Sequence, residues 1–137
     1  MNLFKIGRYK CVAAIHDTTL YNMVIIGVKK PDFLQFNSLI RENLRINMIS
    51  QGFTEKQVQR ILSISEEMKY TKTHNRRALG CLKDVIQTVQ FLYPGEKEIM
   101  NADIMEMNLD NNHIPFSKLK HYPIKVMNEY LDQLLVD

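Results

Sequence analysis

Residues 11–28 read CVAAIHDTTLYNMVIIGV, which is two apolar runs around a polar centre. The runs, residues 11–15 and 20–28, are rich in β-branched side chains, and His16-Asp17-Thr18-Thr19 separates them. This pattern predicts a β-hairpin whose strands are joined by the polar turn. Because the runs are almost continuously apolar, we expect both faces of the strands to be buried.

The residues that follow the hairpin show helical periodicity. Pro31 suits the first turn of a helix, where its missing N–H breaks no hydrogen bond. Gly52 is a natural residue to end that helix. The apolar side chains that recur at helical spacing between them are Phe33, Phe36, Ile40, Leu44 and Met48.

A second helix is expected directly after the first. Thr54 and Gln57 have the spacing of a capping box, in which each residue satisfies a backbone N–H of the other. The apolar stripe of this helix is Val58, Ile61, Leu62 and Met68. Because only residues 52–54 separate the two helices, we predict that they pair as an antiparallel αα-hairpin.

The remaining elements complete the predicted order. Residues 68–73 and 103–109 alternate in character over a short length, which predicts two more strands. Asn75 suits the N-cap of a helix that ends at Tyr93-Pro94-Gly95, and a last helix begins at Pro123. The order β-β-α-α-β-α-β-α, over one domain of residues 1–137, predicts an α+β fold with a small, mostly antiparallel sheet covered by helices.

The overall composition excludes some classes of protein. A hydrophobic fraction of 45% and a charged fraction of 24% are ordinary globular values, which favours a packed core over disorder. A net charge of +3 argues against a protein that mimics DNA with a surface of carboxylates. No apolar run is long enough to cross a bilayer, and the first residues lack the apolar core of a signal peptide. We therefore expect a cytoplasmic protein with no membrane partner.

The usual signatures of metal, cofactor and nucleophile chemistry are missing from the sequence. The four histidines, His16, His74, His113 and His121, do not have the short spacing of a metal site, and there is no Cys-x-x-Cys. No glycine-rich phosphate loop is present. Cys11 and Cys81 lie in apolar surroundings and are expected to be small buried hydrophobes in a reducing compartment. No metal, cofactor or catalytic residue is therefore assigned.

A basic segment provides the candidate binding site. Between Met68 and Lys83 there are five lysines and arginines, one histidine and no acidic residue. Arg76 and Arg77 fall in the first turn of the predicted helix, where a cation is disfavoured by about 0.3–1 kcal/mol. The free N–H groups, the helix dipole and two guanidinium groups all attract an anion. The predicted anion or nucleic-acid site comprises Lys72, Thr73, His74, Asn75, Arg76 and Arg77.

The competing interpretation of these arginines is structural. Arginines at the start of a helix are often solvated, or they pair with a carboxylate of the same fold, for which Glu66, Glu67 or Asp84 could serve. Gly80 carries a further expectation. Inside a helix it costs about 1 kcal/mol relative to Ala, which predicts that another backbone approaches closely there.

The same residues carry a resemblance. The stretch from Tyr70 to Leu82, YTKTHNRRALGCL, resembles the signature of an uncharacterised bacterial domain-of-unknown-function family associated with plasmids and phages. The turn at residues 16–21 and the later Asn108, Pro115 and Tyr122-Pro123 are similar as well. The family pattern commonly has Asn where this chain has Lys83. The resemblance implies a shared fold and a shared Thr/Asn/Arg site, and it implies no activity.

Three functions remain open at this point. The first is a non-catalytic binding protein of a mobile element or bacterium, which holds a nucleic acid or nucleotide at the basic helix start. The second is a phage-encoded anti-defence (anti-CRISPR-like) inhibitor, which would contact a host protein through an exposed apolar patch. The third is a small ribonuclease-like enzyme with His74 or His121 as its base. Binding is favoured over catalysis because no catalytic constellation is evident.

Overall fold

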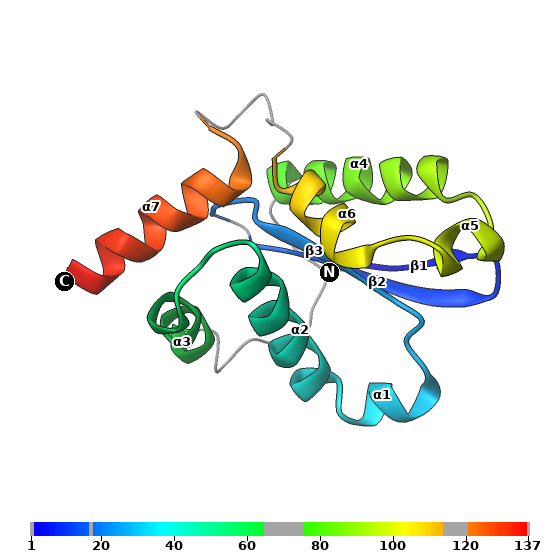
Figure 1. Cartoon of the computed structure of the whole chain (residues 1–137), viewed down its shortest axis with the longest axis horizontal. Coiled ribbons are helices and arrows are strands. Elements are labelled where there is room, and N and C mark those ends of the chain that lie inside the picture. Colours follow the sequence, from blue (N-terminus) through cyan, green and yellow to red (C-terminus); the bar gives the residue numbers. More distant parts are fainter. Residues whose placement is uncertain (1, 17, 65–75, 114–120, 137) are drawn as a thin grey trace.

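The computed structural model describes residues 2–16, 18–64, 76–113 and 121–136 (Figure 1). Its strands are β1 (Asn2–Ile6), β2 (Tyr9–Ile15) and β3 (Asn22–Ile26). Its helices are α1 (Lys30–Leu34), α2 (Phe36–Ser50), α3 (Glu55–Ile64), α4 (Arg76–Leu92), α5 (Glu96–Met100), α6 (Ile104–Asn111) and α7 (Pro123–Val136). The α+β class with an antiparallel sheet is confirmed. The strand predicted at residues 68–73 lies outside the described residues.

The sheet has the order β1-β2-β3, with both pairs antiparallel. The predicted hairpin is β2 with β3, in which Cys11 pairs with Ile26 and Ile15 pairs with Asn22. β1 was not predicted. It joins β2 through a two-residue turn in which Gly7 has a φ of 59°, the left-handed conformation that such turns require.

Helices cover both faces of the hairpin, as Figure 1 shows for α4 and α2. One face, which includes Cys11, Ala13 and Val24, packs with Leu82 and Val85 of α4 in one core cluster. The side chains of the opposite face that pack with Ile40 of α2 include Val12, Met23 and Ile25. The expectation that both faces of these strands are buried is therefore confirmed.

The helix predicted from Pro31 to Met48 is divided in the structure. Pro31 lies in the first turn of α1, as expected, but α1 ends at Leu34 and α2 begins at Phe36. Gln35 between them has φ −123° and ψ 39°, which is not helical. The Phe33 and Phe36 rings stack across this break, with 5.9 Å between their centroids. The apolar periodicity of the sequence continues through Gln35, so the sequence pattern does not reveal the break between α1 and α2.

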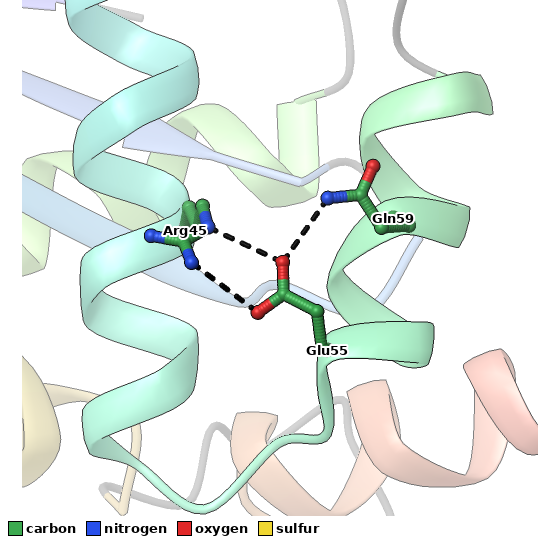
Figure 2. A network of polar contacts seen from close by, with 3 residues as sticks. All are labelled: Arg45, Glu55 and Gln59. Carbon is green, nitrogen blue, oxygen red and sulfur yellow. Dashed lines mark hydrogen bonds and ion pairs between the residues drawn. The ribbon is translucent and has the colours of Figure 1, made fainter.

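The αα-hairpin of α2 and α3 is held at its turn and along its exposed side. Thr54 Oγ1 accepts a hydrogen bond from Gln57 N, and Gln57 Oε1 accepts one from Thr54 N, which confirms the capping box. Figure 2 shows Arg45 of α2 bridging to Glu55 of α3, with Nε 3.3 Å and Nη2 3.4 Å from the carboxylate oxygens. Gln59 Nε2 donates to the same carboxylate at 3.1 Å. Because this ion pair is exposed, it contributes little to stability.

The prediction of a fourth strand at residues 103–109 is wrong, because these residues form most of α6. Asp103 is the N-cap of this helix, and its side chain accepts a hydrogen bond from Glu106 N. α6 lies beside β3, which is an edge strand of the sheet. The alternation of Met105, Met107 and other residues was too short to distinguish a strand from a helix.

Two asparagines bond to the backbone edge of β3, as a neighbouring strand would. Asn108 Oδ1 accepts from Val24 N at 2.8 Å, and Asn108 Nδ2 donates to Val24 O at 3.1 Å. Asn112 Oδ1 accepts from Asn22 N at 2.8 Å, and Asn112 Nδ2 donates to Asn22 O at 2.7 Å. We call this set of four bonds the amide ladder.

The geometry of the amide ladder follows from the two kinds of backbone. A side-chain amide has an acceptor and a donor, as a peptide group does. Residues four apart on a helix rise by about 6 Å, and residues two apart on a strand by about 6.6 Å. The spacing therefore lets Asn108 bond to Val24 while Asn112 bonds to Asn22.

The last helix begins where the sequence predicts. α7 starts at Pro123, and its buried side chains Ile124, Met127 and Leu131 share a core cluster with Val58 and Ile61 of α3. Leu134 is part of the predicted stripe, but its side chain lies outside the described part of the structure. Among the helices that the structure describes, none is both long and apolar enough to cross a membrane.

Candidate functional site

The basic helix start is only partly within the described residues. Arg76 and Arg77 form the first turn of α4, as predicted, and no acidic residue lies in that turn. The other four predicted site residues, Lys72, Thr73, His74 and Asn75, lie outside the described residues. Within the described residues, the site consists of the two arginines and the groups that contact them.

Arg77 is held by the turn of the hairpin. Its side chain is half-buried, and Nη2 donates a hydrogen bond to the carbonyl oxygen of Thr18 at 3.2 Å. This contact ties the start of α4 to the β2–β3 turn, 59 positions earlier in the chain. The sequence interpretation missed Thr18 as a partner, because a backbone carbonyl leaves no signature in the residue type.

Described residues of the β2–β3 turn are hydrogen-bonded to one another. His16 O accepts a hydrogen bond from Leu20 N, and His16 N donates to Tyr21 O, both at 2.8 Å. The His16 ring adds two contacts to Thr19, with Nδ1 3.0 Å from Oγ1 and 3.2 Å from the backbone nitrogen. Arg77 thus contacts a hydrogen-bonded part of the turn through one N–H of its guanidinium group.

No described carboxylate neutralises the two arginines. Within the described ranges, ion pairs join Arg8 to Glu96 and Arg45 to Glu55, and none involves Arg76 or Arg77. Asp84, one of the carboxylates considered from sequence, is exposed and forms no ion pair with them. The other two, Glu66 and Glu67, lie outside the described residues.

The arrangement can attract an anion. A carbonyl oxygen accepts one N–H of Arg77 and leaves its positive charge uncompensated, whereas a carboxylate would have cancelled it. Arg76 is exposed at the same helix start. Both charges lie at the positive end of the dipole of a 17-residue helix.

The histidines that the structure describes lie against aromatic rings or directly ahead of α7. The His16 ring lies against Tyr130, with 5.4 Å between centroids, and the His113 ring lies against Tyr122 at 5.0 Å. His121 is half-buried ahead of α7, and His74 lies outside the described residues. The described residues hold no group of three His, Cys, Asp or Glu side chains close enough to bind a metal.

The two cysteines do not form a disulfide with each other. Cys11 is buried on β2, and burial raises the pKa of its thiol, which disfavours the nucleophilic thiolate at neutral pH. Cys81 is only half-buried, so the expectation of a fully buried hydrophobe holds for Cys11 and not for Cys81.

Comparison with known protein families gives a match. A family model described as a domain of unknown function (DUF6933) matches residues 1–126. The chain belongs to this family. In this DUF6933 domain the match includes both arginines, the β2–β3 turn and the amide ladder, and it confirms the resemblance to an uncharacterised domain family. Comparison with curated proteins gives no match, and comparison with solved structures gives none either.

Proposed function

We propose that this DUF6933 domain is a non-catalytic, cytoplasmic binding protein that holds a phosphate-bearing partner, a nucleic acid or a nucleotide, at the start of α4. One observation carries the proposal. Arg77 is positioned by a backbone carbonyl of the hairpin turn and has no carboxylate partner among the described residues. Its guanidinium group is therefore held on one side by the turn, and no described carboxylate compensates its charge.

The energetics of the helix start support an anionic ligand. Two cations in the first turn are unfavourable for the isolated helix by about 0.3–1 kcal/mol each. A phosphate group placed there would remove that penalty, because it would accept hydrogen bonds from the guanidinium groups and interact favourably with the helix dipole. The exposure of Arg76 leaves it accessible to a ligand.

The test is ligand-induced stabilisation. We would measure the melting temperature of the wild type and of Arg76→Gln/Arg77→Gln with nucleotides and with short DNA and RNA. At a ligand concentration of about 100 times Kd, the wild type should gain about 2.7 kcal/mol of stability. For a domain of this size that corresponds to a rise of roughly 10 °C in Tm. The double variant should show little of this gain.

Two controls make the test specific. Lys56→Gln/Lys125→Gln removes the same charge from exposed positions on α3 and α7, and it should respond as the wild type does. For a nucleic acid with two phosphate contacts, raising the salt from about 50 to about 200 mM should weaken binding roughly tenfold. Equal responses of the arginine variant and the wild type, or an affinity that does not change with salt, would refute the proposal.

A second candidate function has its own supporting observation. Three apolar side chains near the end of α4 and on α5 are largely exposed, namely Phe91 (83%), Leu92 (57%) and Met100 (69%). Exposed side chains of this kind suit contact with a partner protein, as an anti-defence inhibitor would make. Phe91→Ser/Leu92→Ser should then abolish capture of that protein and leave phosphate-dependent stabilisation unchanged.

A further inference from the structure

A hollow of about 290 Å³ lies at the end of the sheet opposite to the Arg77–Thr18 contact. Two segments form it, one from the β1–β2 turn into β2 and one directly after β3. The lining residues are Arg8, Tyr9, Lys10, Gly27, Val28, Lys29 and Lys30. The segments are joined by a hydrogen bond from Val28 N to Lys10 O at 2.8 Å.

The backbone brings the cations of these two segments together. Gly27 has a φ of 77°, in the left-handed region that glycine adopts without strain, and the chain changes direction there at the end of β3. Lys29 and Lys30 consequently face the same hollow as Arg8 and Lys10, about 20 positions earlier in the sequence. Tyr9 is half-buried and supplies an aromatic wall.

The charge around the hollow is only partly compensated. Glu96 neutralises Arg8, with Oε2 3.0 Å from Arg8 Nε and Oε1 2.8 Å from Arg8 N. The three lysines, Lys10, Lys29 and Lys30, are exposed, and none forms an ion pair with a carboxylate in the described part of the chain.

Two neighbouring residues change this balance in opposite directions. Asp32 brings a negative charge beside the hollow, because its carboxylate accepts a hydrogen bond from the backbone N–H of Lys29 at 2.8 Å, but it makes no ion pair with a lysine side chain among the described residues. On the next strand, Lys5 lies directly opposite Lys10 in the register of β1 and β2. Like charges in directly opposed positions of an antiparallel pair are destabilising, and a bound anion would relieve that repulsion.

We infer that this hollow is a second anion site, independent of α4, which takes a ligand with several linked phosphates. Converging lysine ammonium groups act as point charges and suit a chain of phosphates. The volume of the hollow lies just below the usual range for ligand sites, which suits a phosphate chain better than a large rigid ligand. Because β2 has seven residues, the hollow and the Thr18 carbonyl are about 20 Å apart. One triphosphate therefore cannot reach both sites.

The experiment is calorimetric titration with inorganic tripolyphosphate at low salt. Lys29→Gln/Lys30→Gln should bind tripolyphosphate about tenfold more weakly than the wild type does, or weaker still. Both side chains are exposed, and the cap of α1 uses only the backbone of Lys29, so the variant retains its fold. Lys10→Gln, a change on a different segment of the hollow, should lower the affinity as well.

The controls separate this site from general attraction and from α4. Lys56→Gln/Lys125→Gln removes the same charge elsewhere and should bind tripolyphosphate as the wild type does. Arg76→Gln/Arg77→Gln leaves the hollow intact, so the binding that Lys29→Gln/Lys30→Gln removes should persist in this variant, whether or not the proposed function at α4 is correct. Absence of binding to the wild type, unchanged affinity of the lysine variants, or equal losses in the charge-matched control would overturn the inference.

Two further titrations identify the source of the phosphates. A nucleoside triphosphate and a single-stranded DNA of about ten nucleotides would each be titrated into the wild type and into Lys29→Gln/Lys30→Gln. A loss confined to the nucleoside triphosphate assigns the hollow to a free nucleotide. A loss confined to the DNA assigns it to the phosphates of a nucleic acid, and a loss for neither contradicts the inference.

Discussion

The amide ladder gives the sharpest prediction about stability. Asn108 has 0% exposure, and its amide bonds to Val24 N, Val24 O and Asn47 Oδ1. Asn108→Ala would leave these three buried atoms without a partner. Each unsatisfied backbone group costs about 1–3 kcal/mol, and the lost side-chain volume adds to this. We therefore expect a loss of about 3–6 kcal/mol, a large share of the 5–15 kcal/mol that stabilises a typical domain.

The assay is urea denaturation followed by circular dichroism, with Asn101→Ala as the matched control. Asn101 is exposed, and its amide bonds only to Lys97 O among the described residues, so this change should cost less than about 0.5 kcal/mol. Hydrogen exchange gives a local readout, because the Val24 amide should be protected in the wild type and exposed to exchange in Asn108→Ala. Equal stability losses in the two variants, or a Val24 amide that remains protected, would refute the reasoning.

Three further predictions concern single positions. Gly80 is exposed inside α4, with no described atom within 4 Å of an added Cβ, so Gly80→Ala should raise Tm and stabilise by about 0.5–1 kcal/mol. Hydrogen bonds from Gln59 and, to a smaller extent, from Arg45 lower the pKa of Glu55. An NMR titration should find this pKa below 4.5 in the wild type, and Gln59→Ala should raise it. Its stabilising contribution should disappear as the pH falls through the folded-state pKa. Burial raises the pKa of Tyr21 above its ordinary 10.0, so absorbance titration should show this phenol still neutral at about pH 11. The stability that comes from burying the neutral Tyr21 phenol is complete below pH 10 and is lost as the pH rises through the raised pKa. Tyr21→Phe should remove this pH dependence.

Local patterns in the sequence were sufficient for the elements that their own residues determine. The β2–β3 hairpin, the Thr54–Gln57 capping box and the start of α7 at Pro123 all depend on nearby residues, and all three are confirmed. β1 was missed because the side chains described as packing in the core, Phe4 and Ile6, are too few to establish a period.

The error at residues 103–109 has a different cause. Alternation over seven residues is compatible with a short strand and with a helix whose buried face includes Met107 and Asn108. What decides between them is the set of bonds from Asn108 to Val24, 84 positions earlier. The sequence suggested a further strand without indicating where in the sheet it would lie. It could not indicate that side-chain amides bond to the edge of β3.

The candidate site follows the same division between local and distant information. The position of Arg76 and Arg77 in the first turn of a helix was predictable from capping and periodicity. The close approach predicted at Gly80 is not found among the described residues. The lysine hollow could have been found by extending the hairpin register, because a pair at Cys11 and Ile26 places Lys10 beside Gly27 and hence near Lys29.

The construction of the sheet limits where a ligand can reach the hairpin. Helices bury both faces of β2 and β3, and the amide ladder bonds to Asn22 and Val24 on the outer edge of β3. The two ends of the hairpin remain, and each of them presents cations without a described carboxylate partner. At the turn end, a planar guanidinium group is fixed against a carbonyl, a geometry that suits one phosphate held in a defined orientation. At the other end, flexible lysines surround a hollow, which suits several phosphates of variable position. The two sites should therefore differ in selectivity as well as in place, with the geometry of a single phosphate governing the first and the number of linked phosphates governing the second.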